Sequence, residues 1–262
     1  MNLPRKNLLG TLVTLCDYAS ATQAILAAAR EHRPFGVAAQ PVHGITTAWL
    51  DRSYGAVLNA MDLVTPDGQP VRWALNHLHH AHLADRVYGP NLTLAVCAGA
   101  AAERLPVFLY GATPEVLDRF AKALQERFPG LLVAGTLSPP FRPLADAEEE
   151  AHARTIRESG ARLVLVGLGC PRQERWVHRN RARVGVPLLA VGAAFDFISG
   201  QKPWAPAWMQ RFGLEWLFRL ASEPRRLAGR YLLLNPLYVA LVSLQMLGVT
   251  FPEHHPADPP AI

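Results

Sequence analysis

The chain has 262 residues, of which 50% are hydrophobic and 18% are charged, and it carries a formal net charge of +5 at pH 7. This apolar share excludes an intrinsically disordered protein, and the length suffices for a large core in one or two domains. Three cysteines cannot close a disulfide framework, which favours a reducing compartment over a secreted, disulfide-stapled fold. The basic excess fits nucleic acid, a membrane surface or phosphorylated substrates, and does not choose among them.

The N-terminal segment has two interpretations. Two basic residues precede an apolar stretch over residues 8–16, which is how a signal peptide begins. Gly10 and two threonines interrupt that stretch, and Asp17 ends it early. We therefore expect a first β-strand, followed by a helix from about Ser20.

The middle of the chain repeats a short apolar run, a turn and a helical run. The predicted strands cover residues 106–110, 131–134, 162–167 and 187–191, and the predicted helices cover residues 114–128, 145–158 and 172–183. Apolar strands that alternate with helices favour an α/β fold, with a Rossmann-like, mostly parallel sheet and helices on both faces. In such folds, ligands bind beyond the carboxyl ends of the strands.

The C-terminal region is first basic and then apolar. Residues 202–230 hold six basic residues against two glutamates, and residues 231–252 carry no charge. The uncharged run is long enough to span a bilayer, but Pro236 is expected to break a helix near its start. Our preferred interpretation is an interfacial segment led by the arginines, with a buried core helix and a true membrane span as alternatives.

These patterns divide the chain into three parts. We expect an α/β catalytic core over residues 1–205 and a helical C-terminal appendage over residues 206–250, which holds the arginine cluster and the apolar segment that contacts the membrane. Residues 251–262 are rich in proline and histidine and are predicted to be a loose tail.

Three segments place polar residues and glycines after apolar runs. In residues 63–70, Pro-Asp-Gly is common in β-turns, but Asp67 could also be a general base held at a strand end. The Gly-x-Gly at 167–169 suits close approach of a phosphate to backbone amides, although it is not a dinucleotide fingerprint. In the block from Gly213, Glu215 and Arg219 are spaced for a surface ion pair, while the arginines could instead bind a diphosphate.

Several signatures of other chemistries are absent from the sequence. There is no Asp-x-Asp, the usual carboxylate pair that holds Mg²⁺ on a sugar-nucleotide diphosphate, no Walker A sequence and no Gly-x-Ser-x-Gly. Four histidines (His77, His79, His80 and His82) lie close together, but with no nearby cysteine and few acids they favour a solvated helix face. We therefore expect neither a metal site nor a cofactor.

Taken together, these segments resemble the WecG/TagA/CpsF family of bacterial glycosyltransferases from about Leu8 to Leu247. The matching sequences, in order, are residues 62–68, 85–92, 167–174, 192–196, 205–211 and 213–230. Members of this family transfer a sugar from a UDP-sugar, with inversion and without a required metal, to a polyprenyl-diphosphate-linked saccharide. The resemblance implies a hexosyltransferase of exopolysaccharide or cell-envelope biosynthesis, peripheral on the cytoplasmic face of the plasma membrane.

The resemblance also implies roles for individual residues. The family's proposed general base maps onto Asp67, its arginine before the Gly-Pro motif onto Arg86, and its motif glutamine onto Gln173. The family's appendage docks on the membrane and supplies active-site arginines, which implies a substrate-binding role for Arg219, Arg226 and Arg230. The other substrate contacts expected from the matching motifs are Gly68, Gly89, Asn91, Gly169, Pro171 and Glu174.

One early motif departs from the family. The family often has Thr-x-Asn-x-x-His after an early strand, whereas residues 39–43 read Ala-Gln-Pro-Val-His, and Asn91 stands where aspartate is common. We expect Gln40 and His43 to take over the polar contacts with the substrate. The donor sugar stays open, with UDP-glucose and UDP-linked glucuronic or N-acetyl sugars as the first candidates.

Two other classes of function also stay open. A nucleotide-dependent oxidoreductase fits the α/β pattern but lacks the full glycine fingerprint. A membrane-tethered protein that binds a nucleotide or an anionic lipid without turnover fits the basic and apolar C-terminus. A nucleic-acid partner is disfavoured because the basic residues lie beside apolar rather than stacking aromatic side chains. The expected partners are therefore the donor, the lipid-linked acceptor and the membrane surface, and homo-oligomer formation stays open.

Overall fold

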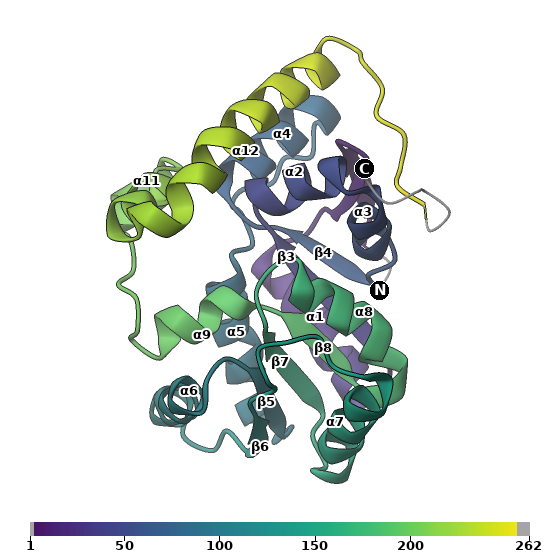
Figure 1. Ribbon diagram of the computed structural model, residues 1–262, viewed down its shortest axis with the longest axis vertical. Helices are drawn as coiled ribbons and strands as arrows, with labels where there is room; N and C mark the ends of the chain where they lie inside the picture. The colour runs from purple at the N-terminus through teal and green to yellow at the C-terminus, as the bar shows by residue number, and fades with distance from the viewer. Residues whose placement is uncertain (1–2, 256–262) are drawn as a thin grey trace.

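A parallel β-sheet covered by helices on both faces forms the centre of the molecule, as the computed structural model of residues 3–255 shows (Figure 1). Its six strands are β3 (Phe35–Gln40), β4 (Leu63–Pro66), β5 (Val107–Gly111), β6 (Val133–Leu137), β7 (Leu163–Gly167) and β8 (Pro187–Ala190), in the spatial order β4-β3-β8-β7-β5-β6. The predicted α/β fold is therefore confirmed. Because all neighbouring pairs are parallel, the carboxyl ends of the strands meet at one edge of the sheet.

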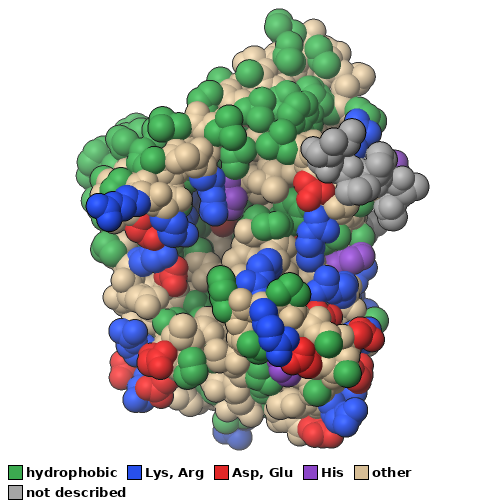
Figure 2. Space-filling view, viewed as in Figure 1, with side chains coloured by type: hydrophobic (Ala, Val, Ile, Leu, Met, Phe, Trp, Pro, Cys, Tyr) green, Lys and Arg blue, Asp and Glu red, His purple; other side chains and the backbone are tan. Residues whose placement is uncertain are grey.

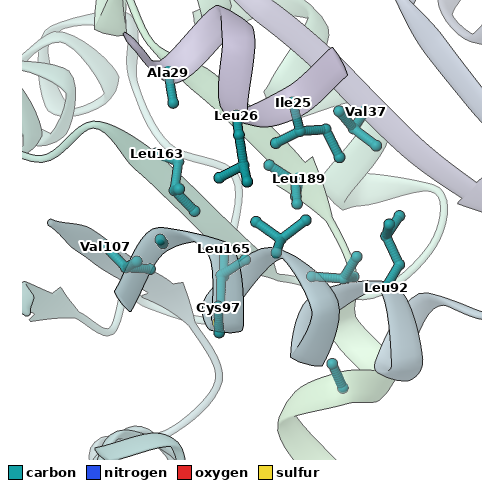
Figure 3. Packing of buried hydrophobic residues seen from close by; sticks show 14 of the residues in the cluster. Ile25, Leu26, Ala29, Val37, Leu92, Cys97, Val107, Leu163, Leu165 and Leu189 are labelled. Carbon is teal, nitrogen blue, oxygen red and sulfur yellow. The ribbon is translucent and has the colours of Figure 1, made fainter. Parts of the chain in front are cut away.

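Two apolar layers explain why the strands read as continuous apolar runs rather than as alternating ones. Leu163 and Leu165 of β7 face one layer (Figure 3), and Val164 and Val166 face the other. The helices of the first layer are α1 (Tyr18–Arg30), α5 (Gly89–Ala102), α6 (Pro114–Arg127) and α9 (Gly192–Ile198). Those of the second are α3 (Arg52–Asn59), α7 (Asp146–Glu158) and α8 (Arg172–Val184).

Most predicted elements of the core lie where the sequence places them, and the differences have local causes. β6 begins at Val133, two residues later than predicted: Leu131 is buried in the first apolar layer, and Leu132 accepts a hydrogen bond from the backbone N–H of Val107 (2.8 Å). The N-terminal segment forms an antiparallel hairpin of β1 (Arg5–Leu8) and β2 (Thr11–Thr14) rather than one strand. Leu9 and Gly10 connect the two strands with positive φ values, as a tight hairpin turn requires.

Three helices, α10 (Ala207–Arg211), α11 (Glu215–Ser222) and α12 (Pro224–Met246), follow the core. α12 packs across α2 (Val42–Leu50) and α4 (Gln69–His79), where Tyr238 and Leu241 are buried. The prediction that Pro236 breaks the helix is wrong, since α12 continues through it. Tyr231 before the proline and Tyr238 after it are both buried, and these contacts hold the helix together where one backbone hydrogen bond is lost.

The outer face of α12 is apolar and exposed. Leu232, Leu233 and Leu247 are each more than 60% exposed, and Figure 2 shows hydrophobic side chains gathered over α12 and α11, with Lys and Arg side chains directly below them in that view. Of the helices within residues 3–255, α12 alone is long and apolar enough to cross a membrane by length and composition, and 33% of its most apolar window is buried against the protein.

Residues 251–255, predicted as the start of a loose tail, instead lie against the core. His254 is only 5% exposed, and its backbone N–H donates a hydrogen bond to the carbonyl oxygen of Gly10 (3.1 Å). The remaining tail, residues 256–262, lies outside the described residues.

Candidate functional site

A cleft of about 900 Å³ opens beyond the carboxyl ends of the central strands and beneath the C-terminal helices. Of the residues predicted for the site, it is lined by His43, Asp67, Gly68, Arg86, Gly89, Gly169, Gln173, Glu174, Arg219, Arg226 and Arg230. Gln40, Asn91 and Pro171 do not line it. The fold therefore brings together residues that are up to 187 positions apart in the sequence.

Two walls of this cleft differ in origin. We call the first the strand-end wall, formed by Asp67, Gly169, Gln173, Glu174 and Gly192, which follow β4, β7 and β8. We call the second the helical wall, formed by His43, Arg219, Arg226, Arg230 and Tyr231, which lie on α2, α11 and α12.

Asp67 lies directly after the last residue of β4, with its carboxyl group in the cleft. Its Oδ2 accepts a hydrogen bond from the backbone N–H of Gly89 (3.0 Å), at the N-terminus of α5. Gly68, with a φ of 105°, then reverses the chain into α4. Burial raises the pKa of Asp67 to about 6, against the opposing effects of Arg86 and the Gly89 N–H. At neutral pH this carboxylate is ionised but close to its pKa, the condition that suits a general base.

Arg86 connects the core to the appendage. Its Nη2 lies 2.6 Å from Oε2 of Glu215, in a pair whose side chains are about one-tenth exposed, and it also donates to Oε1 of Gln210 (3.2 Å). Although burial alone would lower the pKa of Arg86, Glu215 and Asp67 raise it, and the guanidinium stays charged. The predicted surface pair of Glu215 with Arg219 is wrong, because Glu215 points inward to Arg86.

The helical wall contains two buried nitrogen atoms without a hydrogen-bond partner among residues 3–255. They are Nε2 of His43 and Nε of Arg219, and the Arg219 guanidinium lies 5.4 Å from the ring centroid of Phe197. Burial, together with the nearby charges of Arg230, Arg219 and Arg226, lowers the pKa of His43 to about 3, so its imidazole is neutral. Buried polar atoms are normally hydrogen-bonded, which marks these two as atoms that a ligand can satisfy.

In the strand-end wall, by contrast, the amide of Gln173 is hydrogen-bonded within the protein, and Oε2 of Glu174 is the wall's one buried side-chain atom without a partner among the described residues. Oε1 of Gln173 accepts from the backbone N–H groups of both Gly169 (3.2 Å) and Gly192 (3.1 Å), and its Nε2 donates to Oε1 of Glu174 (2.9 Å). The expectation that backbone amides of the Gly-x-Gly segment are free to bind a phosphate is therefore not met at Gly169.

Gln40 lies behind the cleft, in a network that continues from the strand-end wall. Its Nε2 donates to Oε1 of Glu174 (3.2 Å), and its Oε1 accepts from the hydroxyl of Tyr54 (3.2 Å). Burial raises the pKa of Glu174, which is fully shielded from solvent. The structure thus gives Gln40 an internal role instead of the predicted position against a substrate.

Asn91 and Pro171 lie at the starts of helices outside the cleft. Asn91 is exposed in the first turn of α5, where its side chain faces the hydroxyl of Tyr18. Pro171 follows a cis peptide bond from Cys170 and precedes α8.

Sequence reasoning missed several cleft residues. Glu215 was read only as a partner of Arg219, and no signal in one sequence pairs it with Arg86, 129 residues away. Tyr88 and Tyr231 also line the cleft. Lys202, which lies outside it, bridges Asp196 (2.5 Å) and Glu223 (3.2 Å) and so connects α9 to the start of α12.

The four clustered histidines do not form a metal site. In the described part of the chain, no group of three or more His, Cys, Asp or Glu side chains could hold a metal ion. His79, at the end of α4, instead hydrogen-bonds through Nε2 to the carbonyl oxygen of Asn7 (2.7 Å).

Comparison with known proteins agrees with this architecture. Residues 6–250 match the model of the glycosyl transferase WecG/TagA/CpsF family. The chain is 32% identical over 209 residues to the N-acetylglucosaminyldiphosphoundecaprenol N-acetyl-beta-D-mannosaminyltransferase of Bacillus spizizenii, which covers 79% of this chain and 78% of that protein. It is 29% identical over 177 residues to the protein of the same name from Bacillus subtilis strain 168, covering 67% of each chain. The chain therefore belongs to the WecG/TagA/CpsF family of glycosyltransferases.

Proposed function

We propose that this glycosyltransferase moves a sugar from a UDP-sugar to a saccharide carried on a polyprenyl diphosphate, with inversion and without a metal ion. Both relatives are named as N-acetyl-β-D-mannosaminyltransferases acting on N-acetylglucosaminyldiphosphoundecaprenol, which supports an acceptor of that kind and an N-acetylhexosamine as the first donor to test. The observation that carries the proposal is the carboxyl group of Asp67, whose pKa is raised to about 6 and which lies in a cleft whose helical wall holds three arginines.

In the proposed reaction, Asp67 acts as the general base. Its carboxylate takes the proton of the acceptor hydroxyl while that oxygen attacks the anomeric carbon of the donor. The bond from the anomeric carbon to the diphosphate oxygen breaks, and its electron pair leaves with UDP. A positioned base contributes about 10²–10⁴-fold to the rate of such a step. The Gly89 N–H holds the carboxylate in place by its hydrogen bond to Oδ2.

The helical wall would stabilise the departing diphosphate. Guanidinium groups remain charged and bind phosphate oxygens with two parallel hydrogen bonds, and charges placed in advance where negative charge develops stabilise the transition state. Arg219 and Arg230 supply these charges, and the neutral imidazole of His43 supplies an N–H donor in the same wall. This assignment supports metal independence, together with the absence of Asp-x-Asp from the sequence.

The apolar outer face of α12 would bring the enzyme to its lipid-linked acceptor. An exposed apolar helix next to basic side chains suits the surface of an anionic membrane. We place the enzyme peripherally on the cytoplasmic face of the membrane, with the saccharide entering the cleft beneath α12.

The direct test is UDP release by the purified full-length protein. A panel of UDP-sugars would be tried with a lipid-linked N-acetylglucosaminyl diphosphate, with EDTA present throughout. We expect acceptor-dependent release with one donor, and Asp67→Asn as the matched inactive control. Release that requires added Mg²⁺ would contradict metal independence, and UDP binding without any release would favour a binding protein.

A further inference from the structure

The segment of residues 251–255, which we call the strap, returns from the end of α12 to the N-terminal hairpin (Figure 1, yellow end of the chain). The carbonyl oxygen of Phe251 accepts a hydrogen bond from Nδ2 of Asn7 (2.8 Å). The backbone N–H of His254 donates to Gly10, and its carbonyl oxygen accepts from Nδ2 of Asn59 (3.1 Å). The strap therefore binds both the hairpin and α3.

The His254 imidazole fills a notch between two glycines. A Cβ atom at Gly55 would lie 2.3 Å from Cδ2 of His254, and one at Gly10 would lie 2.7 Å from Nε2. Gly10 is also required by the hairpin turn, where its φ is 85°. Gly55 lies inside α3, where alanine would ordinarily be more stable by about 1 kcal/mol. The space that the imidazole occupies thus accounts for a glycine that the helix itself does not need.

The last turn of α12 is fastened to the same hairpin. Oε1 of Gln245 accepts from the backbone N–H of Leu9 (3.1 Å), and its Nε2 donates to the carbonyl oxygen of Asn7 (3.2 Å). Arg226 and Arg230 lie in the first two turns of this same helix. One end of α12 is therefore held by the strap and the hairpin, and the other end carries cations of the cleft.

We infer that the strap positions the arginines of the helical wall, by holding α12 against the core as one continuous rod. α12 is buried along one face only, and Pro236 removes one backbone hydrogen bond near its middle. Without the strap, the half of the helix after Pro236 would keep the contacts of Tyr238, Leu241 and Gln245 but would separate from the core more often. The angle of the half before Pro236 would then be less firmly set. The strap lies beyond residue 250, where the family match ends.

The fastening is tested by hydrogen exchange of the α12 amides in the full-length protein. Gly55→Ala and His254→Ala should each lower protection of residues 237–246 by about tenfold, equivalent to ~1.4 kcal/mol of opening free energy. In the double variant the added methyl group meets no imidazole, so we expect no loss beyond that of His254→Ala alone. Glu126→Gln, at an exposed position of α6 outside the strap, serves as the control and should leave exchange unchanged.

The positioning role rests on the proposed function, whereas the fastening does not. The positioning role is therefore tested by measuring the binding of UDP by calorimetry, because binding requires no turnover. His254→Ala should weaken UDP binding about fivefold at a temperature where the protein stays folded, and Glu126→Gln should not. Unchanged exchange in Gly55→Ala would overturn the fastening, and faster exchange with unchanged UDP affinity would overturn the positioning role. Failure of every UDP-sugar in the release assay would instead count against the proposed reaction and leave both strap measurements interpretable.

Discussion

The two walls of the cleft satisfy their polar groups in opposite ways. In the strand-end wall, Gln173 binds the backbone N–H groups of Gly169 and Gly192 and donates to Glu174, so these donors are satisfied within the protein, and only the acceptor Oε2 of Glu174 has no partner among the described residues. In the helical wall, His43 and Arg219 each keep a buried nitrogen without a partner in the described chain. Folding therefore satisfies the side-chain donors of the first wall, which acts as a framework, whereas the second wall keeps two nitrogen atoms that a ligand can satisfy.

The largest effect should come from Asp67, the ionisable residue of the strand-end wall to which we assign the proton transfer. Asp67→Asn preserves the shape but removes the proton acceptor, so we expect kcat to fall about 10²–10⁴-fold. Folding and UDP affinity should change little, which calorimetry and thermal unfolding would check. Near-wild-type turnover would refute the base assignment.

The next effect tests the helical wall with two arginines of one helix. Arg230 lines the cleft, whereas Arg225 is exposed and does not. Arg230→Ala should lower kcat/KM by about 10²-fold, because a lost electrostatic contact to the leaving group costs about that much. Arg225→Ala has the same change of charge and should leave kcat/KM within about twofold. Equal losses would mean that net charge, not position, matters.

Gln173 tests whether the strand-end wall is a framework. Gln173→Ala leaves the N–H groups of Gly169 and Gly192 without their acceptor, which should lower the free energy of unfolding by about 2 kcal/mol in urea titrations. Arg172→Ala, at the exposed neighbour, is the control. A variant with normal stability but without UDP binding would show that this wall also contacts the ligand, and the contrast between the walls would fail.

The pH dependence follows from the raised pKa of Asp67. The base must be ionised, so kcat/KM should fall below about pH 6, by about tenfold for each pH unit. Because the folded pKa lies above the ordinary value of 3.8, the folded state binds the proton more tightly than the unfolded state. The stability that this proton contributes is present below pH 3.8 and is lost as pH rises through 6. Asp67→Asn should flatten both curves.

The fold was largely predictable, because the core follows local rules. Apolar runs such as residues 163–167 and the acid-led helix at residues 146–158 appear where hydrophobic periodicity and helix-end charge place them. α12 differs, since buried residues on both sides of Pro236 override a local helix-breaking preference. Tertiary contacts of this kind leave no periodic signal in the sequence.

Of the site, the sequence predicted only those residues that lie in motifs of the family. Asp67, Arg86 and Gln173 were located by resemblance, and the structure places all three in the cleft. Gln40 was assigned to the substrate because it stands in the segment where the family has its Thr-x-Asn-x-x-His motif, yet Tyr54 and Glu174 occupy its amide. The partner of a polar side chain depends on which distant segment packs against it, and one sequence does not carry that pairing.

The smallest effect separates hydrogen bonding from charge in the helical wall. With a pKa of about 3, His43 is neutral at pH 7, so replacing it changes no charge. His43→Ala removes the N–H that we assign to a phosphate oxygen, and a hydrogen bond to a charged group is worth ~1.5 kcal/mol, or about tenfold in UDP affinity. The amide nitrogen of glutamine can occupy the place of Nε2, so His43→Gln should retain most of that affinity. The salt dependence of UDP binding should stay the same in both variants but decrease in Arg230→Ala. If His43→Ala binds UDP as tightly as the wild type, the unpaired nitrogen of His43 does not hydrogen-bond to UDP. Only the arginines would then distinguish the helical wall from the strand-end wall.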